Sequence, residues 1–574
     1  MPNLCKQERE HNGMENIIVH PETGRKEGEK KEKAKQFTRF DINDFDDDFL
    51  AIVSSQAFRR LQDKTQVFPL DKSDFVRTRL THSMEVSTIA RQMGVMIAQD
   101  HSKYLKEDFK NDPVLAAKLP TVVSCAGLLH DIGNPPFGHY GESVLGNWFR
   151  KKFQDDSFTF RGVKVADLLN EQMKADLEHF EGNAQGLRIL AKSRNKENGC
   201  DVNLTYAVMN TLIKYPTSST NFDKKHPDVK YHKLGYYYAE KEIMDQVCQA
   251  TGTKTENGYV RHPLVFIMEA ADDIAYATAD LEDAFKKEQF TLDQFMAYFE
   301  KKAAAVFSRK LESFICSYED AALQAKMRQY IVIRNQMKAV LAENAPDAQE
   351  TVKALDAERR ALFTEDEQAA LNALSRTIDN LKKPEARFKV LKKLVAEQEV
   401  RSTETDFNVF SNWLEETRLW LMYSACYAFS MHYQEIMAGT FTKDLFEGTY
   451  SEDLLEIMKS VMREFVYDTH DMVLLQLSAK RIVETLLDDF ISAAMYYDEP
   501  DADQYITLID DRFIRVIPDN FKEDYKAAKR NLPADMENLD GEKLYLRFLM
   551  VTDFISGMTD SYARNLYQIS NGLN

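Results

Sequence analysis

The chain has few cysteines, and none of them lie close together in the sequence. Its 574 residues contain six, at positions 5, 125, 200, 248, 316 and 426, without a CxxC pair. Such scattered thiols argue against a disulfide framework and against a zinc-thiolate site. We therefore expect a protein of the reducing cytoplasm.

Long apolar runs and an excess of positive charge are also absent. No stretch of 18 or more apolar residues occurs, and the beginning, MPNLCKQEREHNG, lacks the apolar segment of a signal peptide. We therefore expect no membrane partner. The formal net charge of −18 weighs against broad nucleic-acid binding. An anionic substrate would need a local cluster of Arg and Lys.

Glycine and proline are sparse, and little of the alternating pattern of a sheet is present. Long amphipathic stretches predict an all-α fold instead. We predict a flexible, charged N-terminal arm over 1–36 and a helical core over 37–300. A helical insertion or lobe over 301–400 and a helical C-terminal region over 401–574, packing back on the core, complete the chain.

One segment, CAGLLHDIGNPPFGHYGE, places acid–base side chains where a helix is expected to end. His130 follows Val123 and Ala126 on one helical stripe, so its side chain is predicted to point inward. Asp131 would then lie at a helix C-terminus, where a negative charge is unfavourable unless a cation compensates it.

Two further segments carry polar residues on apolar helical faces. His82 lies one turn before Val86 in an amphipathic stretch, and Asp272 interrupts the apolar face of PLVFIMEAADDIAYATADLEDAF. Each residue alone has an ordinary explanation as a hydrogen-bonded core residue or a cap. Together His82, His130, Asp131 and Asp272 make a mixed nitrogen and oxygen site for a divalent metal.

The sequence segments around these residues resemble those of a known family. The order His82, His130-Asp131, Asp272 is similar to the signature of HD-domain phosphohydrolases. The blocks AFRRLQDKTQV, RLTHSMEV, LLHDIGNPPFGHYGE, FEGNAQGLRIL, EAADDIAYATADLEDA and DFISGMTDSYA closely resemble the bacterial deoxyguanosine triphosphate triphosphohydrolases.

The resemblance implies a helical HD-domain core that hydrolyses a dNTP, with dGTP favoured, to a deoxynucleoside and inorganic triphosphate. It implies a divalent metal, Mg²⁺ or Mn²⁺, and a homo-oligomer, tetrameric or hexameric. A nucleotide or single-stranded DNA is a possible effector in such enzymes.

Individual roles follow from the resemblance. The metal ligands would be His82, His130, Asp131 and Asp272. His139 is the candidate acid that protonates the leaving oxygen, and Glu142, three residues on, would orient it. Asn134 is assigned no ligand role.

Substrate contacts are implied in the same way. Arg79 matches a phosphate-binding arginine, whereas Arg59 and Arg60 are less certain and at least one is expected to be a structural ion-pair partner. The residues that would contact the sugar are Tyr276, Asp280 and Gln66. Glu181 and Asn183 are expected to orient the metal ligands, or else to form a capping cluster.

Two other functions remain open from the sequence. The same metal site could serve a phosphodiesterase or phosphatase that acts on signalling nucleotides. Alternatively, the chain could be a non-catalytic HD scaffold that binds nucleotides.

Overall fold

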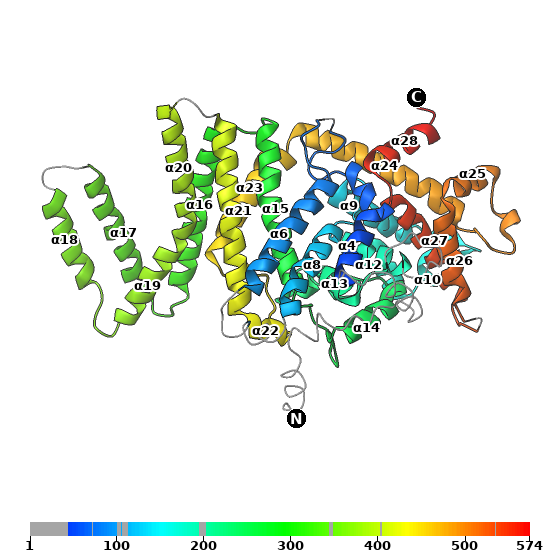
Figure 1. Cartoon of the computed structure of the whole chain (residues 1–574), viewed down its shortest axis with the longest axis horizontal. Coiled ribbons are helices and arrows are strands. Elements are labelled where there is room, and N and C mark those ends of the chain that lie inside the picture. Colours follow the sequence, from blue (N-terminus) through cyan, green and yellow to red (C-terminus); the bar gives the residue numbers. More distant parts are fainter. Residues whose placement is uncertain are drawn as a thin grey trace. The chain divides into compact units, whose positions relative to one another are not determined.

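The computed structural model describes residues 44–71, 73–99, 105, 113–193, 203–343, 348–401, 405–533 and 535–573. The predicted arm over 1–36 lies outside these ranges. Within them the chain is almost entirely helical, which confirms the predicted all-α class (Figure 1). The described strands form two short antiparallel hairpins: β1 (Thr159–Phe160) with β2 (Val163–Lys164), and β3 (Lys254–Thr255) with β4 (Gly258–Tyr259).

The chain divides into two compact units. Unit 1 comprises residues 1–283, 418–447 and 466–574, and unit 2 comprises 284–417 and 448–465. Unit 2 includes the whole of the predicted 301–400 insertion. Helices α15 (Val265–Lys286) and α21 (Asp406–Met431) and the π-helical turn Arg463–Tyr467 have residues in both units.

The remaining helices of unit 1 come from both ends of the chain. They are α4 (Asp44–Ser54), α5 (Gln56–Arg59), α6 (Arg79–Ala98), α8 (Pro113–Leu129), α9 (Gly138–Gln154), α10 (Val165–Leu168), α11 (Glu171–Glu178), α12 (Gly182–Ser193), α13 (Tyr206–Leu212), α14 (Lys241–Ala250), α22 (Tyr433–Met437), α24 (His470–Ala494), α25 (Leu508–Val516), α26 (Asp519–Arg530), α27 (Leu539–Ser556) and α28 (Asp560–Ser570). Short 3₁₀ turns span Arg60–Asp63, Val229–Tyr231, Tyr238–Glu240 and Ala502–Gln504.

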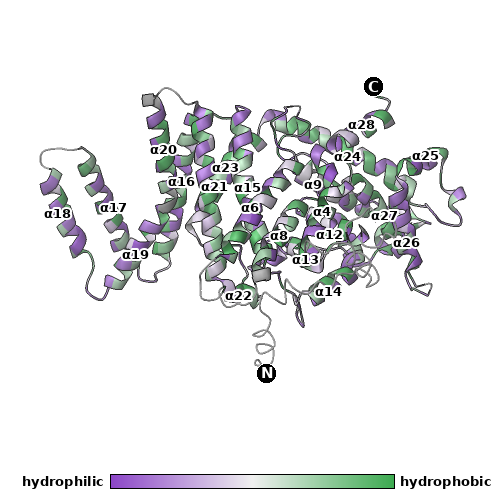
Figure 2. Ribbon diagram, in the orientation of Figure 1, coloured by the Kyte–Doolittle hydropathy of each residue, from purple (hydrophilic) through white to green (hydrophobic). Residues whose placement is uncertain are grey.

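Unit 2 is built from longer helices with its own small core. The helices are α16 (Leu292–Cys316), α17 (Ala321–Glu343), α18 (Ala348–Ala361), α19 (Gln368–Leu381), α20 (Lys383–Arg401) and α23 (Tyr450–Met462). In α19, Leu374 and Ile378 are buried and the residues between them are polar. Figure 2 shows both hydrophilic and hydrophobic residues along the helices of the chain. This spacing is the amphipathic pattern of a helix with one packed face.

Helix α6 shows how local sequence positions the site. It begins with a capping box in which the side chains of Thr78 and Thr81 bond each other's backbone N–H groups. Further along, Gly94 faces α8, where a Cβ would lie 2.9 Å from the Cα of Pro120. The missing side chain therefore allows α6 and α8 to approach closely.

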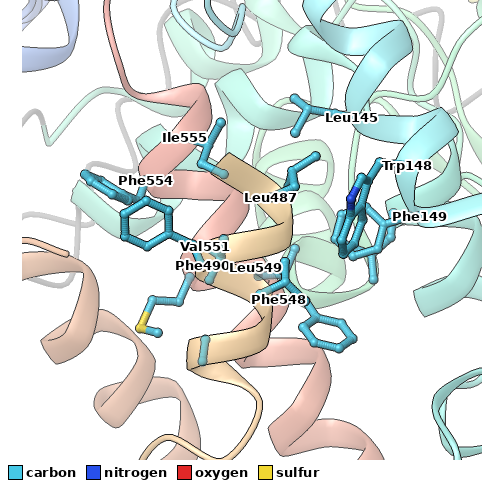
Figure 3. Close-up of a cluster of buried hydrophobic side chains, with 14 of the residues drawn as sticks. Leu145, Trp148, Phe149, Leu487, Phe490, Phe548, Leu549, Val551, Phe554 and Ile555 are labelled. Atoms are coloured by element: carbon cyan, nitrogen blue, oxygen red, sulfur yellow. The ribbon is translucent and has the colours of Figure 1, made fainter. Parts of the chain in front are cut away.

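A buried hydrophobic cluster of unit 1 joins α9 to α24 and α27 (Figure 3). The Phe149 and Phe548 rings are 5.9 Å apart, and Phe490 stands edge-on to Phe554 at 5.2 Å. These aromatic pairs are buried, so each contributes both apolar area and ring contact. The cluster fixes α9, which begins beside the predicted metal ligands.

Within the described ranges, no helix has both the length and the apolar composition needed to cross a bilayer.

Candidate metal centre

Three segments of unit 1 bring the four predicted ligands together. His82 lies in the first turn of α6 and Asp272 lies within α15. Helix α8 ends at Leu129, so His130 and Asp131 lie in the turn that follows it rather than in the helix itself. The sequence had placed the helix end at the glycine and prolines of this turn; the structure ends the helix earlier.

The two histidines face the same carboxylate. The Nε2 atoms of His82 and His130 each lie 3.3 Å from Asp272 Oδ1. His130 Nε2 is also 3.5 Å from Asp131 Oδ2, and both imidazoles are buried. Ligand atoms of His82, His130 and Asp131 lie within 4.8 Å of one another.

The hydrogen bonding of His130 tests whether a cation fits there. Its Nδ1 lies 2.8 Å from the carbonyl oxygen of Gly127, and a carbonyl only accepts, so Nδ1 carries the proton. Its Nε2 is buried and has no hydrogen-bond partner among the described residues. In the neutral ring this atom directs a lone pair at two carboxylates, an arrangement that a bound divalent cation would satisfy. The residues present therefore fit a mixed nitrogen and oxygen metal site.

Two basic side chains balance the ligand carboxylates. Arg79 Nη1 lies 2.6 Å from Asp131 Oδ2, and Lys214 Nζ lies 2.6 Å from Asp272 Oδ2. Burial raises the pKa of both carboxyls, but the basic side chain beside each one, together with His82 and His130, outweighs burial and holds each pKa below its usual range. Two positive and two negative charges cancel, so a divalent cation would leave the centre positive.

Sequence periodicity does not identify Lys214, which follows the short helix α13. Its partner is 58 residues away, and no local periodicity connects the two. Arg59 donates instead to the carbonyl of Ser54, and Arg60 has no ion-pair partner in the described part of the chain. The expected ion pair for one of these two arginines is therefore not found.

Asn134 orients a ligand, a role that the sequence did not predict. Its side-chain Nδ2 donates to Asp131 Oδ1, and its backbone oxygen accepts from Lys64 Nζ at 2.6 Å. The same turn contains Phe137 at a φ of 63°, an uncommon conformation for a residue other than glycine. The Phe137 N–H donates to Asp560 Oδ1 at 3.0 Å, which ties the strained turn to α28.

His139 and Glu142 form a hydrogen-bonded pair in the first turn of α9. His139 Nδ1 lies 2.7 Å from Glu142 Oε2; the imidazole is 72% exposed and the carboxylate 9% exposed. Glu142 raises the pKa of His139. Burial raises the pKa of Glu142, but His139 and Lys233 outweigh it and lower that pKa to about 2. The pair thus combines a fixed carboxylate with an accessible proton donor.

Glu181 and Asn183 lie beside this pair rather than beside the metal ligands. Asn183 Nδ2 donates to Glu181 Oε1 at 2.6 Å, and Lys233 Nζ lies 3.0 Å from the same oxygen. Neither residue bonds a predicted ligand among the described residues. Between them, Gly182 N–H donates to Glu142 Oε1 at 2.9 Å. The Gly182 N–H therefore supports the carboxylate that holds His139, and the orienting role of Glu181 and Asn183 towards the metal ligands stays a prediction.

The predicted sugar contacts include a carboxylate without a partner. Asp280 is fully buried, and neither of its oxygens has a hydrogen-bond partner in the described ranges. Burial raises its pKa to about 7. Buried Gln66 Oε1 is likewise unpartnered within those ranges. Such unmet hydrogen-bonding capacity is costly unless a ligand uses it.

Tyr467 contacts a predicted sugar-binding residue, a neighbour that the sequence did not reveal. Its hydroxyl lies 3.0 Å from that of Tyr276, and it belongs to the π-helical turn Arg463–Tyr467. Burial raises the pKa of Tyr467 well above its usual value, and Asp280 raises it further. Turns of this kind are often found at functional sites. A π turn has no strong sequence signature, so the pairing of these phenols is visible only in the fold.

The sequence is similar to known proteins. Residues 79–204 match the model of the HD domain family. Deoxyguanosinetriphosphate triphosphohydrolase-like proteins of Listeria monocytogenes and Listeria innocua are each 37% identical over 531 residues, which cover 92% of this chain and 94% of theirs. A protein of the same description from Synechocystis is 29% identical over 542 residues, 93% of this chain and 95% of its own.

Proposed function

The chain belongs to the family of deoxyguanosinetriphosphate triphosphohydrolase-like proteins, and from that premise we propose that it hydrolyses deoxynucleoside triphosphates, with dGTP favoured. The products would be the deoxynucleoside and inorganic triphosphate. The observation that carries the proposal is the convergence of His82 and His130 on Asp272, beside the His139–Glu142 pair. On the family resemblance we expect a cytoplasmic homo-oligomer.

The cofactor in this proposal is a divalent metal, Mg²⁺ or Mn²⁺, held by His82, His130, Asp131 and Asp272. When bound, it supplies Lewis-acid polarisation of a phosphoryl oxygen. Asn134 and Lys214 keep the two carboxylates oriented, since each bonds one carboxylate oxygen.

Charge balance favours an anionic substrate. Arg79 and Lys214 already neutralise Asp131 and Asp272, so a bound cation adds an uncompensated double positive charge. The buried Nε of Arg79 has no partner among the described residues and is a remaining donor for a phosphate. A triphosphate would satisfy both through charge-assisted hydrogen bonds.

His139 has the position and charge of the acid that the leaving group needs. Hydrolysis at the α-phosphorus expels the 5′-oxygen of the sugar, which leaves more readily when it is protonated. Nδ1 of His139 is bound to Glu142, so Nε2 is the atom that can transfer a proton to that oxygen. The exposed ring can reach a substrate without leaving its buried carboxylate partner.

The deoxyribose would lie between the phenols and Asp280. We assign Asp280 to the 3′-hydroxyl, because its unpartnered carboxylate needs a donor. Gln66 offers an unpartnered amide oxygen for the same sugar. The contact between Tyr276 and Tyr467 holds one ring beside the other, and we propose that this wall excludes a 2′-hydroxyl.

Product analysis with isotopic water tests the reaction. The purified protein would be incubated with each dNTP and with GTP, with Mg²⁺ or Mn²⁺, in ¹⁸O-enriched water. We expect deoxynucleoside and intact triphosphate, with one ¹⁸O in the triphosphate, because water attacks the α-phosphorus and the bond to the 5′-oxygen breaks. The double variant His130→Ala, Asp131→Ala is the control and should form neither product.

Other products would contradict the proposal in distinct ways. Diphosphate or free phosphate would show attack at another phosphorus. Turnover of cyclic or polyphosphorylated signalling nucleotides alone would indicate a phosphodiesterase or phosphatase. Nucleotide binding without metal and without turnover would identify a non-catalytic scaffold.

A further inference from the structure

Unit 1 contains a cavity of about 310 Å³ behind the turn that carries the metal ligands. Ile132, the residue after Asp131, lines it, and so do residues of α12, α26 and α27. The charged side chains of its wall are Arg60, Lys64, Lys192, Asp524 and Asp553. The proposed hydrolase site uses none of these five.

The two acidic residues of the cavity are already matched by basic ones. Arg188 Nε lies 2.8 Å from Asp553 Oδ1, and Lys192 Nζ bonds the other oxygen of Asp553. Lys192 is also 3.9 Å from Asp524. Arg188 also bonds the buried carboxylate of Glu240, so Arg188 and Lys192 together face three carboxylates, those of Asp524, Asp553 and Glu240.

Two cations remain without a carboxylate. Neither Arg60 nor Lys64 forms an ion pair with any residue in the described ranges. Lys64 is buried, and its Nζ donates to the carbonyl oxygens of Asn134 at 2.6 Å and Ser556 at 2.8 Å. An ammonium has three donors, so these bonds leave one unused.

Burial makes these two charges expensive for the folded protein. It lowers the pKa of Lys64 to about 7 and also lowers the pKa of Arg60. Gly557 keeps space beside the guanidinium, since a Cβ there would lie 3.2 Å from Arg60 Nη1. Asp560 and Asp131 oppose the lowering of the Lys64 pKa without forming an ion pair with Lys64 in the described ranges, and an anion in the cavity would offset more of the burial penalty of both cations.

We propose that this cavity binds a phosphate group through Arg60 and Lys64, at a site separate from the metal centre. A guanidinium and an ammonium are the usual side-chain partners of phosphate. The volume lies near the lower limit of small-molecule sites, roughly 300–1,000 Å³. It accommodates inorganic phosphate or the phosphate end of a small ester.

The site is one hydrogen bond away from the ligand-bearing turn. Lys64 bonds the backbone of Asn134, whose side chain bonds Asp131. An anion that draws on Lys64 therefore acts on the residue that orients a predicted metal ligand.

Calorimetric titration of the metal-free full chain with inorganic phosphate tests the proposal. We expect Arg60→Gln to bind phosphate roughly 10- to 100-fold more weakly, the loss of one charged hydrogen bond. Arg60→Lys keeps the charge and should retain more of the affinity. Arg59→Gln is the matched control, since this neighbour loses the same charge but bonds only the Ser54 carbonyl and does not line the cavity.

Arg79→Gln separates this cavity from the metal centre. If it abolishes phosphate binding while Arg60→Gln binds as the wild type does, phosphate binds at the metal centre and the proposal is overturned. Absence of phosphate binding to the wild type at millimolar concentration overturns it as well. The outcome does not depend on turnover, so it stands apart from the hydrolase proposal.

A second titration, with guanosine 5′-monophosphate, distinguishes the two sources of the phosphate group. Arg60-dependent binding tighter than that of phosphate identifies an ester as the occupant. Equal or weaker binding identifies the free ion.

Discussion

Two buried carboxyls in unit 1 have pKa values shifted in opposite directions by their surroundings. Burial without a partner raises the pKa of Asp280 to about 7. Glu142 is also buried, yet His139 and Lys233 lower its pKa to about 2. The first carboxyl is therefore available to a ligand, whereas the second is a permanent anion that holds an imidazole. The environment of each carboxyl, rather than its residue type, therefore determines its role.

Removing the charge of Glu142 should change the pH profile of turnover. Glu142 raises the pKa of His139 above 6.5, so the imidazolium persists to higher pH and activity falls as pH rises through that raised pKa. In Glu142→Gln the pKa returns towards 6.5, and we expect the alkaline limb of kcat to move to lower pH. Ser143→Ala, which removes a hydroxyl bonded to the His139 carbonyl, is the control without a charge change. If the alkaline limb of the kcat profile does not move in Glu142→Gln, the result contradicts the role of His139 as the acid.

Asp280→Asn should make the metal-free protein more stable and less active. The folded protein raises the pKa of Asp280 from 3.8 to about 7, so ionisation destabilises it increasingly as pH rises through this range. We expect a gain of about 1–3 kcal/mol in unfolding free energy above pH 7, measured in EDTA. The gain should disappear below the unfolded value of 3.8.

The same variant tests the assignment to the sugar. If Asp280 bonds the 3′-hydroxyl, Asp280→Asn should lower kcat/KM for dGTP and leave the rate with the 2′,3′-dideoxy analogue nearly unchanged. Equal losses on both substrates would assign Asp280 to another contact.

At the level of helices, buried charge pairs join segments that lie far apart in the chain. Asp553 of α27 accepts from Arg188 Nε and Nη2 of α12 at 2.8 and 2.9 Å, and from Gln185 at 2.8 Å. Asp560, at the start of α28, bonds both Thr65 and the Phe137 backbone. The block DFISGMTDSYA therefore contacts the turn that follows His130 and Asp131 and helps to hold it in place.

Breaking the Asp553 cluster should destabilise unit 1 strongly. In Asp553→Ala, Arg188 and Lys192 lose their shared carboxylate inside the protein, and such a loss costs about 3–5 kcal/mol. The midpoint of urea unfolding should fall accordingly. Asp511→Ala breaks the exposed pair with Arg515 and should change stability by less than about 1 kcal/mol. Similar effects of the two variants would show that the buried cluster is not an important tether.

At the level of the whole molecule, an acidic chain places a small group of basic residues around the site. In a chain of net charge −18, an anionic substrate would need a local cluster of Arg and Lys. Arg79, Lys214 and Lys233 are found there, each beside a carboxylate. Cation binding would change this balance from neutral to positive and link stability to the metal.

Metal removal should lower the melting temperature of the full chain. A ligand at 100 times its Kd stabilises the folded state by about 2.7 kcal/mol, so Mg²⁺ or Mn²⁺ should raise Tm relative to EDTA. His130→Ala should abolish this metal-dependent difference. His432→Ala, which removes an exposed histidine paired with Glu435, should retain it. A metal effect that survives in His130→Ala would place the cation elsewhere.

The sequence by itself determined the helical class and the family. Helical class follows from periodicity, because a helix repeats every 3.6 residues and buries one stripe, as α6 does with Val86, Ala90 and Met93. The family follows from sequence segments such as LLHDIGNPPFGHYGE. Both are properties of short segments, which neighbouring residues encode.

Only the tertiary structure decided which side chains meet. Tyr467 lies 191 residues from Tyr276, and Asp560 lies 495 residues from Thr65. The partners of Glu181 and Lys64, and the absence of a hydrogen-bond partner for Asp280 among the described residues, are likewise facts of packing. Contacts between distant segments depend on how whole helices pack against one another, and local sequence patterns do not predict this packing. The residue types therefore indicated the chemistry. The fold determined the pKa shifts and neighbours of these residues, and it formed the cavity that Arg60 and Lys64 line.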